Sequence, residues 1–326
     1  MRGLAIALAV VILIVAGSFA WVRVTEPELR LSFDETQLDE GIDAYLEAAE
    51  AGIADLRPAA RKRVLWAEEP GARTPLSVVY LHGFLASAEE LRPVSERVAE
   101  ALGANLYFTR FTGHGRDGAA MAEAELTDWM DDAAEALAIG RRIGERVLLV
   151  GTSTGGTIAA LALAQDGGAE DVAGVVLISP NFEVKNPAAT VLTWPGISWW
   201  GPLVVGETRS FEPANEEHAE HWTISYPTRA LFPMAQSVAR AGRIDPARFT
   251  MPALFIYADG DEVVDADVTD RVRAGWGGPT DRMEIAPGPG IDPSLHVVAG
   301  DILSPAATDP VAARIAEWAG ALPAPD

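Results

Sequence analysis

The sequence predicts an α/β fold in which a mostly parallel central sheet is flanked by helices. From Val64 onward, short β-rich runs alternate with stretches of helical periodicity, which is the pattern of strand–helix–strand units. Several of these runs are continuously apolar, as expected for parallel strands covered by helices on both faces. The chain has 326 residues, of which 49% are hydrophobic and 22% charged, so it is long enough to bury a full core and is not disordered by composition.

The N-terminal segment, residues 1–24, differs from the rest of the chain. Its uncharged run over 3–22 is bracketed by Arg2 and Arg23, and as a helix it would span about 30 Å, the thickness of a bilayer core. We expect a transmembrane anchor with the remaining chain exported. A cleavable signal peptide with a small-x-small site at 18–20 is the alternative, which would leave the mature protein secreted or periplasmic. The anchor is favoured because the apolar run continues past that site.

The remaining elements follow in order. Residues 25–63 are predicted to form a linker and a helix over 37–53, and residues 64–326 the main domain. The predicted strands share β-branched and aromatic residues and cover 64–66, 76–81, 105–109, 146–150, 172–178, 253–257 and 282–285. The predicted helices lie between or after them, at 87–102, 127–143, 154–165, 266–274 and 310–319.

Residues 181–250 interrupt this alternation with no clear strand, frequent proline and many aromatic residues. Structureless loops of this length are rare in compact domains, so we expect a folded cap. Its tryptophans predict an apolar underside that contacts substrate, with ordinary packing inside the cap as the alternative. The residues predicted to bind substrate are Trp194, Trp199, Trp200 and Trp222.

Composition excludes several classes of function. The chain has 25 Lys and Arg against 47 Asp and Glu, a net charge of −22, which argues against a nucleic-acid-binding protein because phosphate contacts need a basic face. The absence of cysteine excludes disulfides, thiolate metal sites and cysteine nucleophiles. The glycine-rich stretches at 275–279 and 287–290 are expected to be loops, and neither follows a strand with a phosphate-loop pattern, so nucleotide binding is not expected.

A serine stands where a strand turns sharply into a helix. The predicted strand 146–150 runs into Gly151-Thr-Ser153-Thr-Gly155 and then into a helical stretch. Small residues at 151 and 155 avoid a clash at such a turn and leave the serine Oγ exposed, while the helix directs N–H groups at developing negative charge. This context predicts that Ser153 is a nucleophile.

A serine nucleophile needs a base and an acid that orients it. Of five histidines, only His296 follows the late strands. The acid predicted is Asp261, just past the end of strand 253–257, with Asp259 as the reserve. The resulting chain order is serine, aspartate, histidine. The other histidines are expected to be structural, with His82 shaping a loop, His114 ordering another, and His218 and His221 on a solvated helix face rather than in a metal site.

These motifs resemble the α/β-hydrolase superfamily from about Val64 to the C-terminus, and within it the capped serine esterase and monoacylglycerol-lipase-like branch. The matching pieces are Leu81-His-Gly-Phe84, Gly113-His-Gly115, the serine turn, Asp261-Glu-Val-Val264 and His296-Val297. The resemblance implies that the backbone N–H groups of Phe84 and Thr154 form an oxyanion hole. It also implies that the cap, at about 181–250, is a lid inserted after the sixth strand.

The expected function is hydrolysis of small-molecule carboxylic esters with an apolar acyl or alkyl group through an acyl-enzyme, with no cofactor and no metal. Lipase, thioesterase, carbon–carbon bond hydrolase and peptidase activities use the same triad and stay open. A non-catalytic ligand-binding protein on the same fold is a further alternative. The sequence leaves the oligomeric state open.

Overall fold

The computed structural model describes residues 27–323, so the predicted anchor or signal segment lies outside the described residues. A seven-stranded sheet has the order β1-β3-β2-β4-β5-β8-β9, and every neighbouring pair is parallel except the edge pair β1 and β3. The predicted fold class, a mostly parallel sheet flanked by helices, is therefore confirmed. The strands of the sheet are β1 Arg63–Leu65, β2 Thr74–Leu81, β3 Asn105–Phe108, β4 Gly144–Thr152, β5 Val172–Ile178, β8 Ala253–Tyr257 and β9 Thr280–Glu284.

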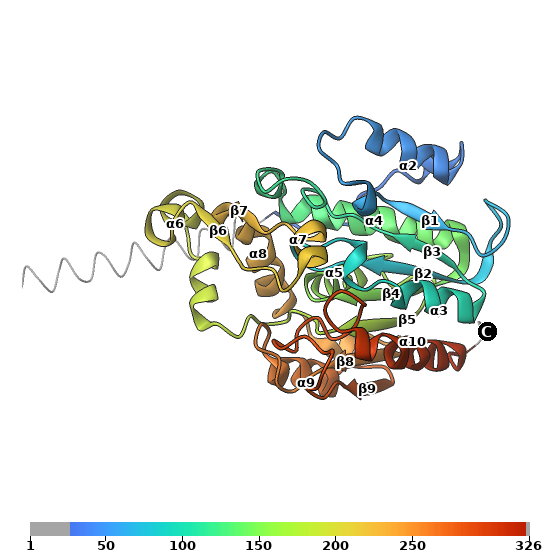
Figure 1. The fold of residues 1–326 in the computed structure, drawn as a ribbon. Coiled ribbons are helices and arrows are strands. Elements are labelled where there is room, and N and C mark those ends of the chain that lie inside the picture. The colour runs from blue at the N-terminus through green and yellow to red at the C-terminus, as the bar shows by residue number, and fades with distance from the viewer. Residues whose placement is uncertain (1–26, 324–326) are drawn as a thin grey trace, which may run out of the picture.

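Helices cover both faces of the sheet (Figure 1). One face packs against α4 Leu126–Ile143, α5 Thr154–Leu163 and α9 Ala266–Gly275. The other packs against α3 Val94–Leu102 and α10 Pro305–Gly320. All seven strands and all five helices predicted for this region form, and the apolar runs of the central strands β2, β4, β5 and β8 are buried between these layers.

The central strands show why the sequence pattern was continuous rather than alternating. Val79 and Leu81 of β2 point into one layer of the core, whereas Val78 and Tyr80 point into the other. Successive side chains of a strand face opposite sides, so a strand covered on both sides must be apolar at every position.

Two predicted helices are divided, and the helix expected over 310–319 begins earlier, at Pro305 of α10. The helix expected over 37–53 is divided into a short 3₁₀ turn at Glu35–Leu38 and α2 Ile42–Ala51, separated by Gly41 with a φ of 111°. The helix expected over 87–102 is divided into the 3₁₀ turn Ala88–Glu90 and α3, which begins after Pro93. Proline disfavours helical geometry in the residue before it, so the helix restarts there.

The cap region contains helices and a small separate sheet (Figure 1). It includes α6 Ile197–Val205, α7 Glu216–His221 and α8 Leu231–Ala241, together with the antiparallel strands β6 Thr208–Ser210 and β7 Ser225–Pro227. The two strands were not predicted, because they are three residues long, largely polar and carry no apolar alternation. Among the described residues, the insertion follows β5, the fifth strand along the chain rather than the sixth, since residues 27–62 form no strand.

The prediction of a membrane segment concerns residues before Pro27. Between Pro27 and Pro323, no helix combines the length and the apolar character that crossing a bilayer requires.

Candidate active site

Ser153 lies directly after β4, at the carboxyl edge of the sheet, and forms the N-cap of α5. Its φ of 50° and ψ of −116° make the sharp turn between strand and helix. The turn is tight: a Cβ on Gly155 would lie 2.0 Å from the Leu81 carbonyl oxygen. The glycine is therefore needed for close approach to the neighbouring strand, and the turn brings the serine to the edge where the β8 and β9 loops meet.

The structure brings Ser153, His296 and Asp261 together. His296 Nε2 lies 2.9 Å from Ser153 Oγ, and His296 Nδ1 lies 2.8 Å from Asp261 Oδ2. Asp261 follows β8 and is buried, and His296 lies in the loop after β9. With Nδ1–H donating to the carboxylate, Nε2 is left to accept the serine proton.

Backbone amides hold the acid and the base in place. Asp261 Oδ1 accepts hydrogen bonds from Val263 N at 2.8 Å and Val264 N at 2.9 Å. Asp292 Oδ2 accepts a hydrogen bond from the His296 backbone N–H at 3.2 Å. This bond lies within the loop that carries His296, residues 285–304, which we call the histidine loop. Asp292 was not predicted, because its position before a histidine in a Pro-rich loop carries no distinctive signal.

The reserve candidate for the acid, Asp259, lies elsewhere. Its side chain is 63% exposed and pairs with Arg282 at the surface. The structure thus places Asp261, and not Asp259, against the histidine.

The two amides expected to form the oxyanion hole flank Ser153. Thr154 begins α5, and Phe84 follows Gly83, where an added Cβ would lie 3.4 Å from Ser153 Cβ. Within residues 27–323, neither the Phe84 nor the Thr154 amide donates a hydrogen bond to another protein group. Both N–H groups therefore have the capacity to bind a negatively charged oxygen.

A buried carboxyl group packs against the loop that contains Phe84, residues 82–87, which we call the Phe84 loop. Glu90 is 3% exposed, and its Oε1 accepts hydrogen bonds from Gly83 N and, at 2.8 Å, from the Tyr80 hydroxyl. Burial raises the pKa of Glu90 to about 7. Glu90 was not predicted as a site residue, because an acidic pair before a helix resembles an ordinary exposed first turn.

His82, which begins this loop, and His114 are both buried. His82 Nδ1 donates to the Gly83 carbonyl at 2.8 Å, and its Nε2 accepts from Phe111 N at 3.1 Å. Burial lowers the pKa of His82 to about 4, and burial also lowers the pKa of His114 well below its usual value. With both ring nitrogens occupied, His82 shapes the loop as expected.

Among the four cap tryptophans, the structure brings Trp222 to the Phe84 loop. Trp222 is buried in an apolar cluster with Leu85 and Met121, against which Phe84 packs, and the next residue, Thr223, donates its amide to the Leu85 carbonyl at 2.9 Å. The other three lie in or just before α6, at the end of the cap far from the sheet (Figure 1). Trp199 is 80% exposed and Trp194 is 47% exposed, while Trp200 is partly buried and packs against Trp194.

The pair His218 and His221 lies on α7. His218 packs edge-to-face on Trp222 with ring centroids 4.7 Å apart and accepts a hydrogen bond from Ala214 N. In the described part of the chain, no group of three or more His, Asp or Glu side chains is arranged to hold a metal ion.

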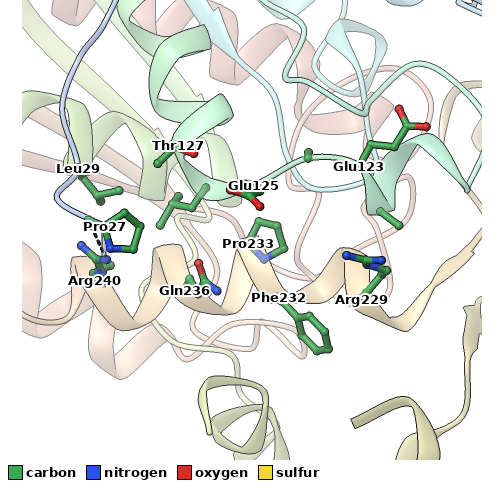
Figure 2. Close-up of a pocket in the computed structure, with 13 residues that line it drawn as sticks. Pro27, Leu29, Glu123, Glu125, Thr127, Arg229, Phe232, Pro233, Gln236 and Arg240 are labelled. Atoms are coloured by element: carbon green, nitrogen blue, oxygen red, sulfur yellow. Dashed lines mark hydrogen bonds between the residues drawn. The ribbon is translucent and has the colours of Figure 1, made fainter. Parts of the chain in front are cut away.

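A separate surface groove of about 290 Å³ lies between the chain at Pro27, the start of α4 and α8 (Figure 2). Pro27 and Leu29 form one wall, and Phe232 and Pro233 of α8 form another. None of the three residues Ser153, Asp261 and His296 lines it. The groove is therefore separate from the site formed by Ser153, His296 and Asp261.

The sequence is similar to that of known proteins. The sequence profile of the family described as serine aminopeptidase, S33, matches residues 73–288. A thermostable monoacylglycerol lipase from Bacillus sp. strain H-257 is 26% identical over 202 residues, which cover 62% of this chain and 76% of that protein.

Solved structures share the fold. A structure from work on the metagenome-derived lipolytic enzymes LipS and LipT superposes with a TM-score of 0.64 at 22% identity, covering 80% of this chain and 99% of that one. The monoacylglycerol lipase of Paleococcus ferrophilus superposes with a TM-score of 0.55 at 16% identity, covering 79% of this chain and 97% of its own.

Proposed function

Because this chain belongs to the serine aminopeptidase S33 family of α/β-hydrolases, we propose that it is a carboxylic ester hydrolase with Ser153 as its nucleophile. The observation that carries the proposal is the hydrogen-bonded series from Ser153 Oγ through His296 to Asp261. The similarity to a relative named as a monoacylglycerol lipase supports an ester, rather than another acyl compound, as the proposed substrate.

The proposed reaction has two halves. Ser153 Oγ attacks the ester carbonyl while its proton passes to His296 Nε2, and Asp261 stabilises the imidazolium that forms. The N–H groups of Phe84 and Thr154 hold the oxyanion. The intermediate collapses, the alcohol leaves with the proton from His296, and an acyl-enzyme remains. Water then attacks the acyl group with His296 as base, and the carboxylic acid is released.

The substrate is proposed to carry an apolar acyl or alkyl group. An apolar cluster borders the Phe84 loop and contains Trp222, Leu85 and Met121. A hydrocarbon chain on the ester would be transferred from water to this cluster, close to the reacting carbonyl. Residues 181–250 accordingly act as the lid, with Trp222 as the cap residue that contacts substrate. The exposed Trp194 and Trp199 support a role at the outer surface of the lid instead.

The test is hydrolysis of p-nitrophenyl butyrate by the wild-type protein and by Ser153→Ala. We expect the variant to lose at least about 10³-fold in kcat while its thermal unfolding stays unchanged, because only the nucleophile is removed. Activity retained by a folded Ser153→Ala variant would refute the proposal. Peptidase activity is tested alongside with an aminoacyl p-nitroanilide, and faster cleavage of the anilide than of the ester would reassign the substrate class.

We also propose that residues 1–24 anchor the protein in a membrane, with the hydrolase domain exported. Two observations outside that segment support this arrangement. The described chain begins on the cap, where the Pro27 carbonyl accepts a hydrogen bond from Arg240 of α8 (Figure 2). In the same cap, α6 exposes Trp199, Leu203 and Val204 to solvent. An anchor that ends at residue 24, three residues before Pro27, would hold this apolar surface near lipid.

A further inference from the structure

Glu90 occupies a position that the proposed reaction does not explain. It ends the 3₁₀ turn Ala88–Glu90, which follows the Phe84 loop and precedes α3. Its side chain turns inward, away from its neighbour Glu89, which pairs with Arg63 and Arg92 nearer the surface. A buried carboxyl group is costly unless its hydrogen bonds are satisfied.

The hydrogen bonds of Glu90 lie at the ends of β2 and β4, the two strands that precede the oxyanion amides. Its Oε1 accepts from Gly83 N, the amide directly before Phe84, and from the hydroxyl of Tyr80 on β2. The Tyr80 oxygen also lies 3.1 Å from Thr152 Oγ1, on the residue before Ser153. Glu90 is thus bonded directly to the end of β2 and, through the Tyr80 hydroxyl, is linked to the end of β4.

The contact is close on the side of the nucleophile as well. A Cβ added to Gly83 would lie 2.9 Å from Glu90 Oε2 and 3.4 Å from Ser153 Cβ. Glu90 Oε2 and Ser153 Cβ thus lie on the same side of Gly83, where a side chain would stand. Gly83 leads into Phe84, whose N–H must point at the developing oxyanion.

The 3₁₀ turn that carries Glu90 also contacts the histidine loop. A Cβ on Gly300 would lie 2.2 Å from the Glu90 carbonyl oxygen, and Asp301 N donates to the Arg92 carbonyl at 3.0 Å. The Phe84 loop and the histidine loop thus both contact this turn, and these contacts hold the Glu90 carboxyl group next to the Gly83 amide.

We propose that Glu90 is a positioning residue for the oxyanion hole, whose carboxyl oxygen fixes the Gly83 amide and thereby aims the Phe84 N–H at the oxyanion. This inference rests on the proposed ester hydrolysis by Ser153. Its energetic consequence is specific: charge on the carbonyl oxygen develops in the transition state, so misdirecting one donor lowers kcat and leaves ground-state binding nearly unchanged.

The test compares Glu90→Leu, Glu90→Gln and the matched control Glu89→Gln with the wild-type protein in hydrolysis of p-nitrophenyl butyrate. Glu90→Leu removes the acceptor, and we expect kcat to fall by about 10² with KM within about threefold, as for loss of one oxyanion donor. Glu90→Gln keeps an acceptor oxygen and should retain kcat within about fivefold. Glu89→Gln should match the wild type.

A transition-state analogue separates positioning from a general loss of structure. A trifluoromethyl ketone forms a bond to Ser153 Oγ and places an oxyanion in the hole, so its inhibition constant should rise for Glu90→Leu by about the factor lost in kcat. Tyr80→Phe, which leaves the carboxyl group but removes one of its donors, should lower kcat by several-fold with unchanged KM and serves if Glu90→Leu does not fold.

The outcomes are distinct. A wild-type protein that does not hydrolyse the ester overturns the proposed function and this inference with it. A wild-type protein that is active, with a folded Glu90→Leu or Tyr80→Phe variant of equal kcat, overturns the role of Glu90 alone. A Glu90→Leu variant whose KM rises while kcat is kept assigns Glu90 to substrate binding and also contradicts the inference.

Discussion

Ser153 has a backbone conformation that side chains rarely adopt, with a φ of 50°, and its neighbours must permit it. Its amide donates to the Ile178 carbonyl at 2.9 Å, and its carbonyl accepts from Asn181 N at 3.1 Å. These bonds tie the turn to β5 and to the start of the cap. The strained conformation persists because the surrounding structure determines it, and it keeps Oγ directed at His296.

The glycine after the serine is predicted to be essential for folding of this turn. An alanine at Gly155 would place its Cβ 2.0 Å from a backbone oxygen, so Gly155→Ala should lower the free energy of unfolding by about 3 kcal/mol or more. Gly52→Ala is the control, because no atom lies within 4 Å of its Cβ position and its φ is −94°. It should change stability by less than about 0.5 kcal/mol. Equal urea midpoints for the two variants would contradict this account of the turn.

The raised pKa of Glu90 predicts a pH-dependent effect on stability. The pKa is about 7 in the folded protein against 4.5 for the free group, so the folded state retains a proton that the unfolded state has lost. The stabilising contribution is complete below pH 4.5 and is lost as pH rises through 7, a change of about 3 kcal/mol.

Glu90→Gln stays neutral and avoids that loss. Relative to the wild type, its free energy of unfolding should therefore increase between pH 5 and about pH 8, as measured by urea denaturation at both values. Tyr80 and His296 are the titratable groups that face Glu90, and both remain in the variant. Parallel stability curves for the two proteins would show that Glu90 is ionised throughout.

At the scale of elements, the cap is joined to the catalytic domain through the segment at Trp222 and Thr223. The Thr223 amide donates to Leu85, and Trp222 packs among residues of the Phe84 loop. The apolar underside of the cap is thus formed by the segment between α7 and β7, whereas α6 presents apolar side chains to solvent. These are two different surfaces, which the sequence could not tell apart because both are rich in tryptophan.

Substitution of Trp222 should discriminate between acyl chain lengths. We expect Trp222→Ala to lower kcat/KM for p-nitrophenyl octanoate by about tenfold and to change the acetate ester far less, because only the longer chain reaches the apolar cluster. Trp199→Ala, at an 80% exposed position, should leave both values unchanged. If the two variants behave alike on the soluble esters, Trp222 does not contact substrate.

The elements that the sequence predicted best are those buried on two faces. β5 and β8 match their predicted bounds, and Ser153 was found from the abrupt change between β4 and α5. The missed features depend on tertiary contacts: β6 and β7 pair only with each other at an exposed site, and Glu90 and Asp292 gain their roles from backbone amides that the fold brings near. Residue type alone does not distinguish a buried carboxylate from a surface one.

At the scale of the whole molecule, charge and hydropathy separate along the chain. Arg2 and Arg23 flank the apolar run, while the acidic residues lie after it and give the protein its net charge of −22. An acidic domain favours solubility and disfavours long anionic ligands through repulsion. The segment proposed to anchor the protein in a membrane and the domain proposed to hydrolyse esters are thus different parts of the chain.

Removal of residues 1–24 should release the domain from membranes without changing its catalysis. The full chain should sediment with membranes and have an intact N-terminal region by mass spectrometry, whereas the truncated chain should be recovered in the supernatant with the same kcat on p-nitrophenyl butyrate. A mature N-terminus at Trp21 would show instead that the segment is a cleaved signal peptide.

The claim on which the account depends is that Ser153 is activated by His296. The most direct measurement is labelling of the full chain with a fluorophosphonate, followed by peptide mass spectrometry, since only an activated serine reacts at low reagent concentration. We predict a single adduct on Ser153 in the wild type and its loss in His296→Asn, where the base is removed. An unlabelled wild-type protein, or an adduct at another serine, would contradict the account.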